Sequence, residues 1–190
     1  LHDYETTYLR VGREIADDVP EADHIAYERP TKVAPAGRGR TIAQIVDPYF
    51  DRTWEHFSSH AQTPPARLSK FPAAVIAGRV AYIAYPLFGL HARHGNQHWR
   101  LLLRNVLRHL LPEPILEVTG PSGIETSVMR QPKTPGRPAR TILHLLYYPC
   151  ERRASNLDLI EDIVPLHTLS IRLRPPSKPK RVSRAPDGTE

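Results

Sequence analysis

The chain has 190 residues, of which 40% are hydrophobic, so it can bury one large core or two small ones, and a disordered protein is excluded. Its formal net charge is +6, and its one cysteine, Cys150, excludes an internal disulfide and a four-cysteine zinc site. The sequence has no charged-then-apolar leader and no apolar run near the ~18 residues of a membrane helix, so we expect a cytoplasmic protein without a membrane partner.

Short strands separated by polar loops are expected in the N-terminal part, at residues 24–29 and 41–50. Two further β-prone runs, 73–77 and 80–86, flank the dipeptide Gly78-Arg79, and this pattern predicts a hairpin with a two-residue turn. The second run is almost continuously apolar, which is typical of a strand covered on both faces in the central sheet of an α/β layer structure. The sequence therefore favours an α/β fold for this part of the chain.

One helix is predicted over residues 97–111, because apolar residues recur there at intervals of three and four. Its apolar face is expected to comprise Trp99, Leu102, Leu103, Val106, Leu107, Leu110 and Leu111, and its polar face Arg100, Arg104, Asn105 and Arg108. Asn96 can cap the start of this helix, and Pro112 stops it. Pro112 also marks the boundary that we expect between two domains, residues 1–112 and residues 113–190.

Beyond this boundary the hydrophobic period changes from 3.6 to 2, which predicts a small antiparallel β-sandwich. The expected strands are residues 115–119, 124–131, 140–148 and 167–174. The chain ends in a proline-rich tail with the basic residues Arg172, Arg174, Lys178, Lys180, Arg181 and Arg184. Such a run could hold phosphates, which makes a basic nucleic-acid-binding module a rival function. It lacks the interleaved aromatic residues that stack bases, so nucleic acid is not the partner that we expect.

The segment PYFDRTWEHFSSHAQTPP, residues 48–65, is the first candidate site, because it gathers acid–base, metal-ligating and aromatic side chains between prolines. His56 and His60 are four residues apart, but the zinc-protease pattern H-E-x-x-H needs its glutamate after the first histidine, and here Glu55 precedes it. Trp54 could stack on a sugar ring or a base. The alternative is a structural loop whose aromatic side chains anchor it to a core.

A second candidate is the stretch HARHGNQHW, which places His91, His94 and His98 at the mouth of the predicted helix, where an α/β sheet binds its ligands. No cysteine accompanies these histidines, and no carboxylate occurs between Glu55 and Glu113. We therefore expect neither a metal site nor a cofactor. A metal-dependent hydrolase built on the histidines of the two candidate segments is the second rival function.

Three stretches of the sequence resemble the C-terminal region of large bacterial multidomain glycoside hydrolases that carry a β-galactosidase trimerisation-like domain. They are PYFDRTWEHFSSHAQTPP, GRVAYIAYPLFGLHARHGNQHWRLLLRNVLRHLLPEP and LHLLYYPCERRASNLDLIEDIVPLH, and the resemblance spans most of residues 1–175. It implies a partial α/β domain of the class I glutamine amidotransferase (flavodoxin-like) type over residues 1–112, followed by a small antiparallel β-sandwich over residues 113–190. In such enzymes a TIM barrel that carries both catalytic carboxylates precedes these domains.

The resemblance implies a non-catalytic assembly region of a glycoside hydrolase. The chain starts at Leu1 without an initiator methionine, so we expect a fragment whose catalytic barrel lies upstream. The histidine and glutamate of an active amidotransferase are missing, because Tyr85-Pro86-Leu87 stands in the place of the H-P-E pattern. The implied partners are that barrel and further copies of the chain, a trimer by resemblance. The expected contacts with a sugar cleft or a subunit interface are Trp54, His56, His60, His91 and His94, with no catalytic residue in the chain.

Overall fold

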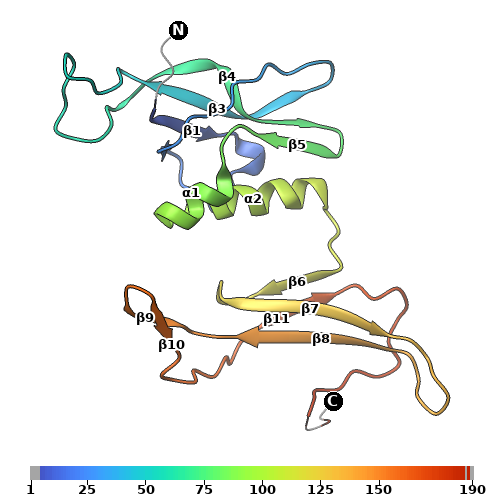
Figure 1. Ribbon diagram of the computed structural model, residues 1–190. Coiled ribbons are helices and arrows are strands. Elements are labelled where there is room, and N and C mark those ends of the chain that lie inside the picture. The colour runs from blue at the N-terminus through green and yellow to red at the C-terminus, as the bar shows by residue number, and fades with distance from the viewer. Residues whose placement is uncertain (1–4, 187, 189–190) are drawn as a thin grey trace. The chain divides into compact units, whose positions relative to one another are not determined.

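The computed structural model describes residues 5–186 and 188 of the chain, which divides into two compact units, Leu1–Glu113 and Pro114–Glu190 (Figure 1). We call them unit 1 and unit 2 and describe each by itself. Neither helix of the described chain is long and apolar enough to cross a membrane.

Unit 1 is built on one five-stranded sheet in which every pair of neighbours is antiparallel. Its strands are β1 (Thr7–Val11), β2 (Asp23–Ala26), β3 (Arg40–Pro48), β4 (Pro65–Ala77) and β5 (Val80–Ile83), in the spatial order β2-β1-β3-β4-β5. A short 3₁₀ turn, η1 (Arg13–Ile15), follows β1. The predicted hairpin is confirmed, because Ala77 pairs with Val80 across a turn in which Gly78 has a φ of +59°. Glycine adopts this left-handed conformation without a steric cost.

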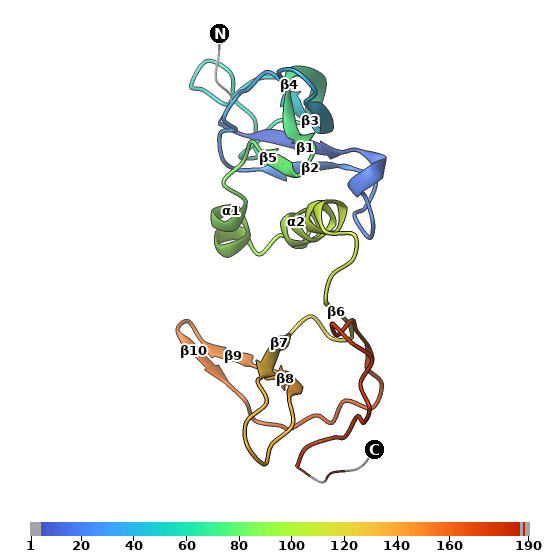
Figure 2. The same ribbon diagram turned by 90° about the vertical axis from the view of Figure 1, so that its right-hand side faces the viewer.

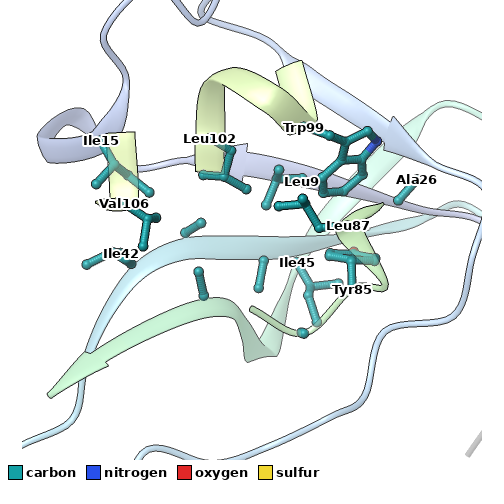
Figure 3. Close-up of a cluster of buried hydrophobic side chains, with 14 of the residues drawn as sticks. Leu9, Ile15, Ala26, Ile42, Ile45, Tyr85, Leu87, Trp99, Leu102 and Val106 are labelled. Atoms are coloured by element: carbon teal, nitrogen blue, oxygen red, sulfur yellow. The ribbon is translucent and has the colours of Figure 1, made fainter. Parts of the chain in front are cut away.

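Two helices, α1 (Leu87–His94) and α2 (Gln97–Leu110), cover one face of this sheet (Figure 2). The apolar face of α2 supplies Trp99, Leu102 and Val106 to the core, where they meet strand residues such as Leu9 and Ile45 (Figure 3). The predicted helix and its buried stripe are thus confirmed, although Leu107 and Leu111 are exposed. Asn96 precedes α2 as expected, but its side chain makes no capping hydrogen bond.

The expected α/β fold, a partial amidotransferase-like (flavodoxin-like) domain over residues 1–112, is wrong. A parallel sheet needs a helical crossover between its strands, whereas here all five strands come first and both helices follow them. The apolar run that suggested a central strand is β5, which lies at the edge of the sheet with Val80 68% exposed. Ala84 and Tyr85, which follow the strand, belong to the core, and Ile83 packs against it. This burial explains why the run is apolar, although β5 has a neighbouring strand on one side only.

Unit 2 is all β, as the alternating pattern predicts. Its strands are β6 (Leu116–Thr119), β7 (Ile124–Gln131), β8 (Arg140–Tyr147), β9 (Glu151–Ala154), β10 (Leu157–Leu159) and β11 (Ser170–Leu173). They form three separate antiparallel pairs, β6 with β11, β7 with β8, and β9 with β10. The β9–β10 hairpin is not among the predicted strands, because its short strands carry polar and charged residues. No residue of unit 2 that the structure describes is fully buried.

Candidate functional site

The first candidate segment forms the connection between β3 and β4, and we call residues 49–64 the aromatic loop. It extends beyond the sheet where these two strands end (Figure 1). Pro48 of β3 faces Pro65 of β4 at its base. Because proline has no backbone N–H, the ladder of hydrogen bonds cannot continue past this pair, and the intervening residues leave the sheet as a loop.

The base of the aromatic loop is held by hydrogen bonds that centre on the buried Thr63. Its hydroxyl donates to the carbonyl oxygen of Phe50 at 2.8 Å and lies 3.3 Å from the Phe50 backbone nitrogen. The Tyr8 hydroxyl of β1 donates to the carbonyl oxygen of Thr63 at 2.6 Å. Burial raises the pKa of Tyr8, so this phenol stays protonated and able to donate. The loop is therefore fixed to the sheet at both of its ends.

The tip of the aromatic loop is held by hydrogen bonds between residues of the loop itself. The Thr53 backbone N–H donates to the His56 carbonyl oxygen at 2.8 Å, and the His56 backbone N–H donates to the Thr53 hydroxyl at 3.0 Å. The His60 carbonyl oxygen accepts from the Arg52 guanidinium at 3.0 Å and from the Ser58 hydroxyl at 2.9 Å. These contacts shape the tip without burying any aromatic ring.

The aromatic side chains of the loop point into solvent. Trp54 is 90% exposed, Phe57 76% and Tyr49 68%. The alternative that the aromatic rings anchor the loop to a core is therefore wrong for these three residues, whereas Phe50 is 37% exposed. The imidazole of His56 packs beside the Phe50 ring with 5.8 Å between their centroids, and the Arg52 guanidinium lies 6.0 Å from the centroid of Phe57. The tip thus presents a mixed aromatic and cationic surface to solvent.

The second candidate segment lies elsewhere in unit 1, where α1 ends and α2 begins. Nδ1 of His91 lies 3.2 Å from the carbonyl oxygen of Asn96, and the His94 ring packs against Tyr27 at 4.9 Å between centroids. The partners in these two contacts, Asn96 and Tyr27, both lie outside the aromatic loop. Sequence reasoning therefore grouped residues that the fold places in two separate sites.

His98 packs against two neighbouring rings. Its ring stacks on His24 of β2 with 4.7 Å between centroids and 25° between planes, and it also lies 4.8 Å from Trp99. Burial first, and then the neighbouring His24, lower the pKa of His98 from 6.5 to about 4. In the part of the chain that the structure describes, no three His, Cys, Asp or Glu side chains are grouped so that they could hold a metal ion.

The basic tail begins as part of the β6–β11 ladder. Nη1 of Arg172 lies 3.2 Å from Oε2 of Glu117, and Nη1 of Arg174 lies 3.1 Å from Oε1 of the same carboxylate. The Arg174 guanidinium also donates to the carbonyl oxygen of Pro114 at 2.6 Å. Both arginines thus share the carboxylate of Glu117, and their side chains stay 69% and 38% exposed.

Several residues around the aromatic loop were missed by sequence reasoning. A small cavity of about 120 Å³ lies at the base of the loop, and Thr6, Phe50, Arg52, Gln62 and Thr63 are among the residues that line it. Thr6 comes from the start of the chain, more than forty positions before the loop. Only the pairing of β1 with β3 brings these residues together, and no local signal in the sequence reveals it.

The whole chain resembles part of a solved glycoside hydrolase. No known protein family and no curated protein matches the sequence. The chain is similar to a solved structure, an α-L-fucosidase isoenzyme 2 from Paenibacillus thiaminolyticus, with a TM-score of 0.86 and 27% sequence identity. The likeness covers 100% of this chain and 28% of the fucosidase, so the chain spans just over a quarter of that protein. The resemblance to glycoside hydrolases is supported at this level, whereas the trimerisation-like domain finds no match among known families.

Proposed function

We propose that this chain is a non-catalytic accessory region of a glycoside hydrolase, and that the protein to which it belongs acts on a fucosyl-type carbohydrate. The observation that carries this proposal is the likeness of the whole chain to part of an α-L-fucosidase, at 27% identity and a TM-score of 0.86. The partners that we propose are the catalytic barrel of the same protein and further copies of the chain, by resemblance a trimer.

The chemistry of the aromatic loop supports a binding role rather than catalysis. Glycoside hydrolysis uses two carboxyl groups held roughly 5–10 Å apart across the sugar, one of them free to give up a proton. Oδ1 of Asp51, within the loop, already accepts the Glu5 backbone N–H at 3.3 Å. The Glu5 carboxylate faces Arg29 at 3.5 Å and is mostly exposed. Carboxylates in such surroundings are suited to fix a loop or bind a hydroxyl group.

Trp54 is the residue through which we propose that the loop makes contact. Burying a large apolar side chain stabilises a protein by roughly 1.5–3 kcal/mol, and this loop forgoes that gain by holding Trp54 90% exposed. Tryptophan offers a large, rigid surface that stacks on sugar rings and fills interface pockets. The hypothesis is that Trp54, with His56 and His60, meets either the rim of the sugar cleft or a neighbouring subunit.

The test is Trp54→Ala in the full-length protein, with Phe88→Ala as a matched control. Phe88 of α1 is also exposed and lies outside the aromatic loop, so its loss removes a similar area without touching the loop. We expect Trp54→Ala to lower kcat/KM for an aryl α-L-fucoside by about ten-fold, which corresponds to ~1.4 kcal/mol, or to reduce the oligomer mass.

Two measurements distinguish contact with the sugar cleft from contact with a neighbouring subunit. One is the turnover of the fucoside, and the other is the oligomer mass, measured by light scattering after gel filtration. A loss of turnover at unchanged mass indicates the sugar cleft, and a loss of mass indicates the subunit interface. The proposal for Trp54 is contradicted when the variant keeps both properties, or when Phe88→Ala has the same effect.

A further inference from the structure

The small cavity at the base of the aromatic loop has the size of a site for one ring. Its volume is about 120 Å³, and it lies between the start of β1 and the two ends of the loop. A cavity needs only ~10–15 Å³ of this kind of volume to hold one water molecule, so there is room for more than solvent. Pockets for drug-sized ligands measure ~300–1,000 Å³, so this cavity is too small for a large ligand.

Three side chains in this cavity keep hydrogen-bonding groups that no described residue engages. The half-buried amide of Gln62 and the half-buried hydroxyl of Thr6 have no hydrogen-bond partner in the described chain. The Arg52 guanidinium uses one nitrogen for the His60 carbonyl oxygen, and its other N–H groups have no hydrogen-bond partner there. Together these groups offer an amide, a hydroxyl and several N–H donors, which suits a ligand that both donates and accepts.

The walls of the cavity are rigid. Thr63 lines it while its hydroxyl is held on both sides by the backbone of Phe50, and its carbonyl oxygen accepts from Tyr8. On the opposite side, the backbone N–H of Glu5 donates to the Asp51 carboxylate. A ligand entering such a site spends little of its binding free energy on ordering the protein, because the surrounding segments are already fixed.

The charges that line the cavity do not favour an anionic ligand. Arg52 is the one basic residue of the described lining, and it stands with the carboxylates of Glu5 and Asp51, so the lining has no excess of positive charge to attract a phosphate or a uronic acid. A neutral hydroxyl group can donate to a carboxylate and accept from a guanidinium at the same time. The lining of the cavity, to which Phe50 contributes, is mostly polar, which suits a ligand with many hydroxyl groups.

We propose that this cavity is a binding subsite for one neutral monosaccharide unit, held by hydrogen bonds from Gln62, Thr6 and Arg52. The choice of a sugar among neutral hydroxylated ligands rests on the proposed function, while the site itself rests on the cavity and its side chains. A shallow site of this size binds weakly, with a dissociation constant in about the millimolar range.

Hydrogen–deuterium exchange of the intact protein tests the subsite, because it reports binding locally and does not respond at this position to sugar bound elsewhere. L-Fucose, D-galactose and the acyclic polyol D-sorbitol are added separately. We expect L-fucose or D-galactose to slow exchange in residues 5–9 and 61–64, which line or flank the cavity but exclude the Trp54 tip, and D-sorbitol to leave it unchanged. Gln62→Leu should weaken this protection about ten-fold in sugar concentration, and Gln131→Leu, a matched half-buried glutamine in unit 2, should leave it intact.

The outcomes separate this inference from the proposed function. Equal protection by D-sorbitol, no protection by either sugar, or equal protection in Gln62→Leu and wild type would each overturn the monosaccharide subsite. These results are independent of the turnover and the oligomer mass of the Trp54→Ala variant, which test the proposed function. Loss of protection in Gln131→Leu also overturns the subsite, since that change lies outside it.

Discussion

A stacked pair of histidines makes unit 1 sensitive to acid. His98 lies against His24 at 4.7 Å between ring centroids, and its ring nitrogen Nε2 is buried without a hydrogen-bond partner among the described residues. Protonation would place a charge in that buried position beside a second imidazole ring. The folded state therefore holds His98 neutral over a range in which the unfolded chain is already protonated.

The sign of the pH dependence follows from the lowered pKa. Between pH 6.5 and about 4 the unfolded state binds more protons at His98 than the folded state does, so stability falls as the pH falls through this window. We expect a loss of about 1 kcal/mol between pH 7 and pH 5, after allowance for the partial exposure of the ring. Urea unfolding followed by tryptophan fluorescence measures it.

His98→Phe keeps the stacking but cannot be protonated, so it should flatten the pH dependence of the unfolding midpoint. Equal slopes for the variant and the wild type would assign the acid sensitivity to other groups. Sequence reasoning could identify His98 as unusual, because it stands beside Trp99 at the start of a helix. It could not identify the partner, because His24 lies on β2, and only the tertiary packing of α2 against this strand brings the two rings together.

At the scale of elements, local patterns predicted the helix and the hairpin, because their signals lie within a few consecutive residues. The order of the strands was beyond such reasoning. The pairing of β1 with β3 joins residues between 32 positions apart (Val11 with Ala43) and 38 positions apart (Tyr8 with Val46), and an apolar run does not reveal whether its strand lies at the centre or at the edge. For the same reason the aromatic loop was predicted as a segment, whereas the cavity beneath it was not.

The polar face of α2 contains one residue, Asn105, that is buried although the helical period of the sequence is correct. Asn105 was expected in solvent beside the arginines, but it is buried, and its amide donates to the carbonyl oxygens of Ile15 and Asp17 at 2.9 and 2.8 Å. Its own oxygen accepts from Nε of Arg104 at 3.0 Å. One side chain of α2 therefore holds the η1 turn and the residues that follow it.

Replacing Asn105 should be costly for this reason. Asn105→Leu would remove the side-chain donor to the Ile15 carbonyl oxygen and leave the Asp17 carbonyl oxygen with Nη2 of Arg104 alone, and we expect the free energy of unfolding to fall by about 1–3 kcal/mol. Arg108→Leu, an exposed position on the same helix, should change it by less than ~0.5 kcal/mol. Urea unfolding of both variants checks the prediction. A small effect at Asn105 would mean that the η1 segment rearranges or that water replaces the amide.

At the scale of the whole molecule, the two units differ in how they are stabilised. Every buried side chain of the described chain belongs to unit 1, where two helices close the core against a five-stranded sheet. Unit 2 consists of two-stranded ladders, and its apolar residues stand on both faces of one of them. Val128 pairs with Leu143 on one face of the β7–β8 ladder, and Met129 pairs with Ile142 on the other. Such a ladder has more apolar surface than unit 2 itself covers.

The two units should therefore behave differently when they are produced separately. We expect residues 1–113 to unfold cooperatively, because they retain Trp99 and the whole of the core. Residues 114–190 should give poorly dispersed NMR spectra and rapid amide exchange, since an isolated two-stranded ladder is marginally stable in water. Dispersed resonances with slow exchange in residues 114–190 would contradict this. In that case the ladders would close a core of their own, and the apolar residues on both faces of β7–β8 would have to meet within unit 2.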